Sequence, residues 1–371
     1  MKSGIGLRAW SWIHRWTSLI STLFLLVLCV SGLPLIYHAE IDRLFGFAPK
    51  AQEVSGPPLS IERLVSAAEK APGGGVVQFV VWEGQSSGLV TMSLGRGIDS
   101  DPAANHSLHV DTHTGAVIEP RGPMEFIRVL HGQLLLGPYG PLALGIVTLL
   151  FLASIVSGVV VYAPFMRRLV FGEVRFERAR RTRWLDLHNL VGIVLTGWMM
   201  VVGFTGMMNT WGTFVIDYWR SDQLTRIVAA QPKSDAPLLA RADAAVDSAR
   251  AAAPGMTPYF MAMPGSILTS RSHYAVFMRG ETPLTSRLVT PVLVDARTGV
   301  SSARIELPGY VKMMLLAEPL HFGDYGGQPL KLLWALLDIL TIGVLITGIY
   351  LWWIKRKPRR HLPRSRHSGE D

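Results

Sequence analysis

Four long apolar segments constrain the fold of this chain more than any other feature. Each exceeds the roughly 20 apolar residues that an α-helix needs to cross a bilayer. The mean hydropathy of +0.30, with 49% hydrophobic residues, is also too high for an ordinary soluble enzyme. We therefore expect a membrane protein with four transmembrane helices. The segments lie near residues 13–37, 139–165, 187–211 and 329–354.

Positive charge is concentrated in segments that would share one side of the membrane. The formal net charge is +9, and seven of the 36 lysines and arginines lie between residues 167 and 183, with seven more after residue 354. The positive-inside rule then predicts that both termini and the middle loop are cytoplasmic and that the two long loops face outward, into the periplasm if the membrane is a bacterial inner membrane. Such clusters suit a lipid bilayer with anionic headgroups, and we expect no nucleic acid as a partner.

The single cysteine, Cys29, lies inside the first apolar segment, so no intrachain disulfide and no cysteine-ligated metal cluster can form. The N-terminal apolar run is long for a signal peptide and matches the third, internal segment. We therefore expect it to be retained as a helix.

Histidines and glycines recur at matched spacings in the two halves of the chain. Two histidines each stand 18 residues before a glycine that follows Ser or Thr, and two more stand 27 residues before such a glycine. Ionisable side chains at membrane segments are costly and usually functional, and matched histidines on opposed helices can hold a cofactor. A histidine at a membrane boundary can also be only an interfacial anchor. The pairs are His14 with Gly32, His188 with Gly206, His131 with Gly158, and His321 with Gly348.

Each long loop is predicted to fold as one helix packed on a small antiparallel sheet. Helix patterns at residues 59–71 and 237–253 end at Pro-Gly sequences, and alternating apolar runs follow them. The runs end in the same turn, Val-Asp-Thr-His-Thr-Gly115 and Val-Asp-Ala-Arg-Thr-Gly299, where Asp can bond its own turn and Gly can adopt a positive φ. The expected fold class is therefore four transmembrane α-helices in two repeated halves, each half with an outward α+β domain.

These features divide the chain into eight predicted segments. They are the cytoplasmic N-terminus with helix 1 (1–38), a periplasmic α+β domain (39–138), helix 2 (139–165), a basic cytoplasmic loop (166–186), helix 3 (187–212), a second periplasmic α+β domain (213–328), helix 4 (329–354) and a basic cytoplasmic tail (355–371).

Several short motifs recur along the chain. They are Ile13-His14-Arg15-Trp16, Trp184-Leu-Asp-Leu-His188, Leu130-His131-Gly132, Leu320-His321-Phe322, the two Val-Asp-x-x-Thr-Gly turns, and the small-Gly-x-x-x-Tyr/Trp ends of the second and fourth helices. Through these motifs the sequence resembles the PepSY-associated transmembrane family over almost the whole chain outside the basic tail. Within that family it is similar to inner-membrane ferric-siderophore reductases of the ferrioxamine-reductase kind, which carry b-type haem.

The resemblance implies two haem b groups with histidine axial ligands. Charge sidedness then sorts the histidines into an inner couple, His14 with His188, and an outer couple, His131 with His321. Two imidazole ligands leave no open position for oxygen, which suits electron transfer. His38, at the outer end of the first helix, is an alternative outer ligand. Arg15 and Arg183 are candidates to contact the haem propionates at the inner couple.

The expected activity is reduction of a periplasmic ferric siderophore, with release of Fe(II). The transfer would be outer-sphere, so no catalytic acid–base residue is expected. The chain has no Gly-rich dinucleotide fingerprint, so the electron donor is external, either quinol or a cytoplasmic flavin reductase. Two alternatives remain open: a transmembrane b-type cytochrome with another periplasmic acceptor, and a non-enzymatic PepSY protein that binds a partner and is anchored by its helices.

Three histidines in the first long loop and one aspartate in the fourth helix lie outside the histidine couples. His106, His109 and His113 fall in a predicted strand and turn, which favours a surface role over a metal site. Asp338 lies about two turns inside the fourth helix, where a carboxyl normally has a partner. It could carry a proton, or it could bond a neighbouring helix at Thr196 or Asn209.

Overall fold

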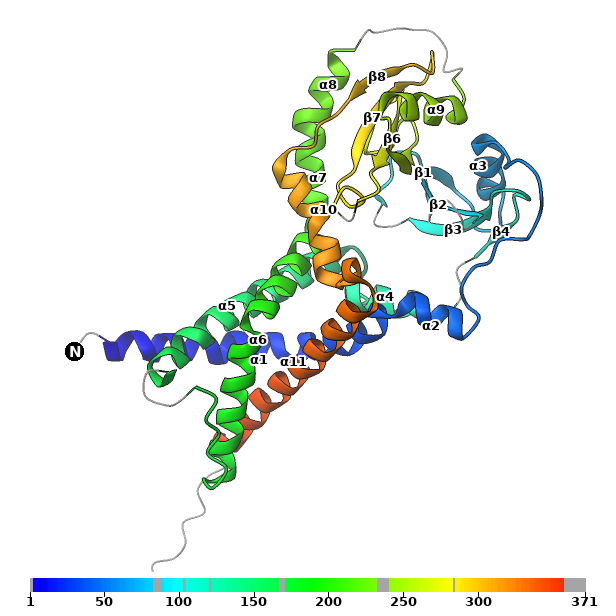
Figure 1. The fold of residues 1–371 in the computed structure, drawn as a ribbon. Coiled ribbons are helices and arrows are strands. Elements are labelled where there is room, and N and C mark those ends of the chain that lie inside the picture. The colour runs from blue at the N-terminus through cyan, green and yellow to red at the C-terminus, as the bar shows by residue number, and fades with distance from the viewer. Residues whose placement is uncertain are drawn as a thin grey trace, which may run out of the picture. The chain divides into compact units, whose positions relative to one another are not determined.

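The computed structural model describes residues 3–82, 88–102, 105–119, 122–166, 171–231, 240–282 and 284–356 (Figure 1). The predicted basic tail beyond residue 356 and residues 167–170 of the predicted cytoplasmic loop lie outside these ranges. The chain divides into two compact units, each built from segments distant in sequence. The first contains Met1–Cys29, Leu150–Met200 and Leu336–Asp371, and the second contains Val30–Leu149 and Val201–Ala335.

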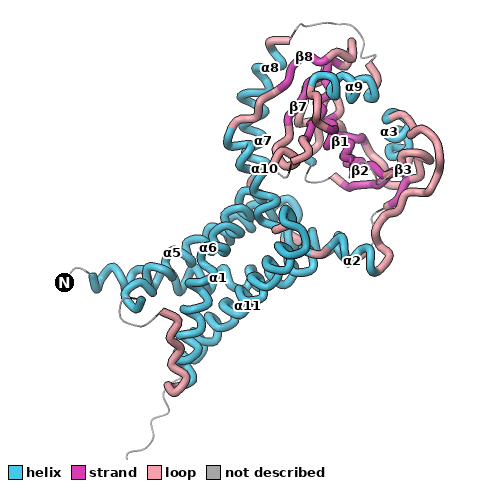
Figure 2. Tube along the Cα trace, viewed as in Figure 1, coloured by secondary structure: helices cyan, strands magenta, loops and turns pink. Residues whose placement is uncertain are grey.

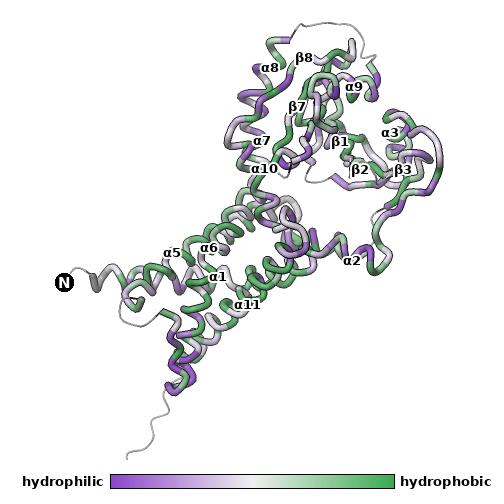
Figure 3. The backbone as a smooth tube through the Cα atoms, in the orientation of Figure 1, coloured by the Kyte–Doolittle hydropathy of each residue, from purple (hydrophilic) through white to green (hydrophobic). Residues whose placement is uncertain are grey.

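Four helices are long and apolar enough to cross a membrane, as the sequence predicts. Figure 3 shows them as mainly hydrophobic along their lengths. A helix satisfies its own backbone hydrogen bonds, which is why such segments are stable in a hydrocarbon environment that offers none. The helices are α1 (Ser3–Ile36), α5 (Gly140–Met166), α6 (Arg180–Thr210) and α11 (Gly327–Arg356).

The strands of both long loops form one antiparallel sheet of eight strands, in the order β4-β3-β2-β1-β5-β6-β7-β8 (Figure 2). The prediction of a separate small sheet in each loop is therefore wrong. The strands β1 and β5 join the two sets, and Val80 faces Met261 across this junction. An unpaired strand edge exposes a row of backbone donors and acceptors, and pairing the two inner edges removes two of them. The strands are β1 (Val76–Trp82), β2 (Leu89–Gly95), β3 (His106–Asp111), β4 (Val117–Ile118), β5 (Thr257–Ala262), β6 (His273–Arg279), β7 (Thr290–Asp295) and β8 (Ser301–Arg304).

Helices cover both faces of this sheet. On one face, α3 (Ile61–Glu69) and α9 (Ala242–Ala252) supply buried apolar side chains to a core shared with the six inner strands. Both helices fall within the predicted patterns. On the other face, Trp219 and Val311 pack in a second core with Phe79 and Phe277. Trp219 belongs to α7 (Gly212–Trp219) and Val311 to α10 (Gly309–Phe322), two helices that the sequence analysis did not predict.

The two predicted turns have the expected conformation. Gly115 and Gly299 have φ values of 71° and 73°, a region that favours glycine. Asp111 accepts hydrogen bonds from the backbone of His113 and Thr114, as an Asx turn requires. His106 and His109 lie in β3, and His109 bonds the Thr91 side chain across to β2 at 2.9 Å. Among the described residues no group of three or more His, Cys, Asp or Glu could hold a metal ion.

Six short segments complete the described helical structure. They are α2 (His38–Leu44), α4 (Pro123–Gln133), a π-helical turn (Arg220–Leu224), α8 (Thr225–Ala229) and two 3-10 turns (Gly137–Tyr139 and Asp324–Gly326).

The ion pair between Glu40 of α2 and Lys331 of α11 makes stability depend on acid pH. Lys331 donates to the two Glu40 oxygens at 2.9 and 3.1 Å, and this bond lowers the pKa of Glu40 from 4.5 to about 2. A carboxylate with a lowered folded-state pKa stabilises the fold above its unfolded pKa, and that contribution is lost as the pH falls toward 2. In thermal unfolding of detergent-solubilised protein, we expect Glu40→Gln to remove about 1 kcal/mol of this acid-dependent stability. Asp247→Asn, at an exposed carboxylate of α9, should keep the wild-type pH dependence; an unchanged slope in Glu40→Gln would contradict the assignment.

Candidate functional site: two histidine couples

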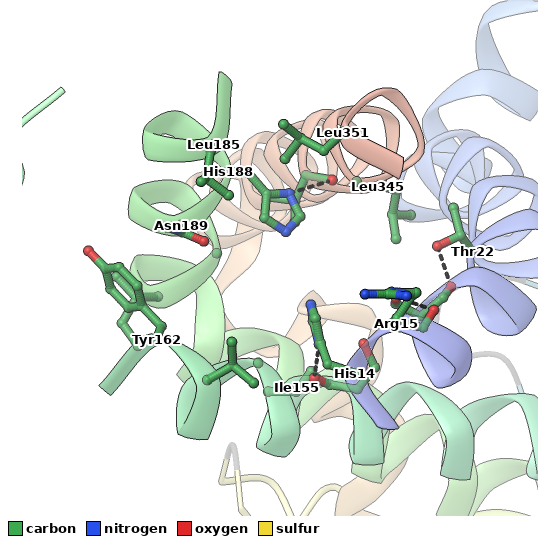
Figure 4. A pocket seen from close by; sticks show the side chains of 18 of the residues that line it. His14, Arg15, Thr22, Ile155, Tyr162, Leu185, His188, Asn189, Leu345 and Leu351 are labelled. Atoms are coloured by element: carbon green, nitrogen blue, oxygen red, sulfur yellow. Dashed lines mark hydrogen bonds between the residues drawn. The ribbon is translucent and has the colours of Figure 1, made fainter. Parts of the chain in front are cut away.

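The inner couple, His14 of α1 and His188 of α6, faces a single cavity of about 460 Å³ (Figure 4). The four long helices line it with both apolar and polar side chains. Ser18 and Gly192, the small residues one turn after each histidine, also line the cavity, as the sequence predicts. A small residue at that position leaves room for a planar group or a neighbouring helix.

Each inner histidine is oriented by the backbone of another helix. His14 Nδ1 lies 2.9 Å from the carbonyl oxygen of Ser154 in α5. His188 Nδ1 lies 3.1 Å from the carbonyl oxygen of Val344 and 3.0 Å from the Thr347 hydroxyl, both in α11. A carbonyl oxygen can only accept, so Nδ1 carries the proton in both rings and Nε2 keeps its lone pair. Metal-bound histidines are held in this way, with one nitrogen donating to a carbonyl and the other free to bind the metal.

The outer couple, His131 of α4 and His321 of α10, lies in the second unit. The two ring centroids are 6.3 Å apart, and the ring planes meet at 61°. His321 Nδ1 lies 3.0 Å from the carbonyl oxygen of Val202 in α6, which fixes its tautomer as at the inner couple. His131 Nδ1 lies 3.1 Å from the Ser31 hydroxyl of α1. Burial lowers the pKa of His321 and outweighs the opposing effect of the Val202 bond, so its ring is neutral at physiological pH, as a metal ligand must be.

Glycines allow the close approach of three of the four rings, and the fourth, His188, lies at ordinary contact distance from its glycine. A Cβ at Gly206 would lie 2.9 Å from Cε1 of His321, and one at Gly158 would lie 3.0 Å from Cε1 of His14. The corresponding distances are 3.2 Å for Gly32 from His131 and 3.5 Å for Gly348 from His188. Each histidine therefore packs against a small-Gly pair on a different helix. The sequence spacing selects the right histidines and glycines but not their contacts. In the structure His14 contacts Gly158 and His131 contacts Gly32.

One geometric feature at each couple agrees with a metal-centred cofactor: the cavity at the inner couple and the ring separation at the outer couple. The inner cavity falls within the roughly 300–1,000 Å³ typical of ligand sites. Metal–imidazole bonds are about 2.0 Å long, so two imidazoles on one metal have ring centres about 6 Å apart. The 6.3 Å separation of the outer rings agrees with that spacing.

Only one of the two arginines predicted to contact the haem propionates lines the inner cavity. Arg15 lines the inner cavity, whereas Arg183 is not among its lining residues and Arg181 takes that place. Arg175, also at the cavity, donates to the buried Asp186 carboxylate at 2.7 and 2.9 Å. The cavity therefore has a basic edge in which one arginine is held by a carboxylate of α6.

His38 has a different environment from the four paired histidines. It is exposed at the start of α2, and its Nδ1 lies 2.9 Å from the carbonyl oxygen of Leu35, only three residues away. No other helix orients it through this bond. His38 therefore shares the Nδ1–carbonyl contact with the couples, but the carbonyl belongs to its own segment and not to another helix.

Asp338 of α11 has a partner that the sequence analysis missed. Its side chain is 8% exposed, and it bonds the thiol of Cys29 in α1 rather than Thr196 or Asn209. Its Oδ2 atom is buried and has no hydrogen-bond partner among the described residues. The single cysteine thus stabilises a polar group within the helices.

The outer histidines lie on two helices that the sequence does not predict. His131 and His321 are expected just before the second and fourth apolar segments, but they belong to separate helices, α4 and α10. Two local signals were present: Pro123 occupies the first turn of α4, and Gly323 ends α10 in a left-handed conformation, with φ at 68°.

The glycine contacts generate a matched pair of substitutions on α6. Gly206→Ala places a Cβ against the His321 ring and should destabilise the protein by about 1–3 kcal/mol. Gly197→Ala meets no heavy atom within 4 Å and should be neutral or stabilising by up to about 1 kcal/mol, because Ala favours helix. Thermal unfolding in detergent compares the two. Equal stabilisation by both substitutions would show that Gly206 does not serve close packing.

Comparison with known proteins agrees with this architecture. No curated protein matches the chain at a significant level. The family described as the PepSY-associated TM region matches residues 11–355, which is nearly the whole chain. This protein is therefore a multi-pass membrane protein that belongs to the PepSY-associated TM family.

Proposed function

We propose that this protein is a di-haem inner-membrane reductase that passes electrons to a periplasmic ferric siderophore. The observation that carries the proposal is the shared geometry of the two histidine couples. In three of the four rings Nδ1 donates to a carbonyl of another helix, which leaves Nε2 available for a metal. An interfacial anchor would not need this arrangement, because a ring at the headgroup region finds its hydrogen bonds in water.

Haem b, when bound, supplies a one-electron Fe(III)/Fe(II) couple. His14 and His188 would hold one group, and His131 and His321 the other. Arg15 and Arg181, both on the inner cavity, are placed to bind anionic propionates, a role for which arginine is well suited. Arg183, which is not among the residues that line the cavity, is a further candidate for this role. The chain's own residues orient the rings through Nδ1 and leave Nε2 available for the metal.

The duplicated pattern supports an assembly of two related halves. Each half supplies two membrane helices, one helix bearing an outer histidine, and four strands of the sheet. The concentration of basic residues at 167–183 and after residue 354 supports cytoplasmic termini, with the sheet in the periplasm. Such a protein would accept electrons from quinol or a cytoplasmic flavin reductase and deliver them outside.

The chemistry at the acceptor requires one electron for each iron. Fe(III) in the chelate becomes Fe(II), which hard oxygen ligands hold far less tightly, so the metal is released. No covalent bond to the protein forms or breaks. The requirement is proximity to the outer couple, which agrees with the absence of any proposed acid–base residue.

Single histidine substitutions test the proposal. We expect the purified protein to show a bis-histidine b-type spectrum in reduced-minus-oxidised absorbance. His188→Ala and His321→Ala should each lose about half of the haem signal, because each removes one ligand of one couple. His38→Ala is the matched control, since its ring is exposed and bonded within its own segment, and it should keep the full signal.

The same preparation separates the proposal from its alternatives. Reoxidation of the reduced protein by a ferric siderophore supports the reductase. A haem signal with no response to ferric chelates identifies a cytochrome with another acceptor. A protein without haem, in which His188→Ala changes nothing, identifies a binding or anchor protein and rejects the proposal.

A further inference from the structure

A cluster of polar side chains lies beside His321 and has no role in the histidine couples. It contains Tyr259 of β5, Arg279 at the end of β6, Arg287 of the following loop, Glu318 of α10, and Asp324 just after α10. We call these five residues the outer polar cluster. All of them belong to the second unit.

Two direct contacts join four of the five residues in pairs. The Arg279 guanidinium carbon lies 5.0 Å from the centre of the Tyr259 ring, within the range of a cation–π interaction. Arg287 donates to Asp324 Oδ2 at 3.0 Å. Burial raises the pKa of Tyr259, and the nearby Glu318 carboxylate raises it further. The ion pair of Arg287 with Asp324 thus joins the loop after β6 to the end of α10.

The outer polar cluster adjoins the outer histidine couple. Glu318 precedes His321 by three residues, which places both on the same side of α10, and Asp324 follows His321 by three. The ring of Phe322 lies 5.6 Å from the ring of His321 and is itself 37% exposed. The Phe322 side chain therefore reaches from the His321 ring to the protein surface.

The charges of the outer polar cluster favour an anion. Arg287 is neutralised by Asp324, but no described carboxylate lies within 4.0 Å of the Arg279 guanidinium. The Glu318 side chain is exposed, so solvent screens its carboxylate from the arginines of the cluster. Asp324 Oδ1 is buried without a hydrogen-bond partner among the described residues, so a hydroxyl donor could complete the site.

We propose that the outer polar cluster is the docking site for the electron acceptor and selects anionic, oxygen-rich metal chelates over neutral ones. Arg279 supplies the charge, Tyr259 a flat surface and a hydroxyl, and Phe322 the contact toward His321. The proposal rests on the proposed function. One electron leaves the reduced protein and Fe(III) of the chelate becomes Fe(II), with no bond to the protein formed or broken.

Binding of redox-inert gallium(III) chelates to the full-length protein in detergent tests this site without electron transfer. The two probes are a trianionic hexadentate tricatecholate complex and a neutral cyclic trihydroxamate complex, measured by equilibrium dialysis. We expect Arg279→Met to weaken binding of the trianion by about tenfold or more, because a hydrogen bond to a charged group contributes about 1.5–3 kcal/mol. Binding of the neutral complex should change less than twofold.

Two further variants keep the test specific. Arg279→Lys preserves the charge and should recover most of the loss, and it controls for folding. Arg304→Met removes an exposed arginine of β8 and should leave both affinities unchanged. Added salt should weaken binding of the trianion alone.

The outcomes distinguish this proposal from the proposed function. Equal affinity for both probes, or a trianion affinity that Arg279→Met leaves unchanged, overturns the docking site even if the haem spectrum is present. Selective loss in Arg279→Met supports it. If that loss occurs in a protein without haem, the anion site stands while the reductase proposal fails.

Discussion

The structure depends on one repeated interaction, in which an imidazole from one helix packs against a small-Gly pair of another. The glycine lets the ring approach the partner backbone. A carbonyl or hydroxyl there binds Nδ1, so a polar side chain is buried among apolar helices without losing its hydrogen bond. A buried polar group without a partner costs several kcal/mol in such an environment. Each ring is thus both a packing element and a polar side chain of fixed orientation.

This interaction also explains why α1 and α6 have special positions in the chain. Each carries a histidine toward one end and a small-Gly pair toward the other, so each belongs to both couples. Small residues at helix contacts in membranes allow close packing that larger side chains would prevent. In α5 and α11 only the small-Gly pair takes part, and in α4 and α10 only the histidine does. The site therefore requires helices that lie far apart in sequence.

Much of this arrangement could be predicted from the sequence, because it follows from local patterns. Apolar length identified the four long helices, and turn chemistry located Gly115 and Gly299. The matched spacings selected the four histidines and their glycines. The contact of His14 with Gly158 could not be read from spacing, since it depends on which helices become neighbours. The pairing of β1 with β5 was missed for the same reason, and α10, which contains Pro319, shows no clear apolar period.

The most direct test of the account is the haem content and ligation of the purified protein. The quantities to determine are the haem-to-protein ratio from the pyridine haemochrome and the spin state from low-temperature electron paramagnetic resonance. We predict a ratio of about two with only low-spin, bis-histidine signals, because the structure contains two couples with oriented rings. Absence of haem, or a high-spin centre with one histidine ligand, would contradict the central claim.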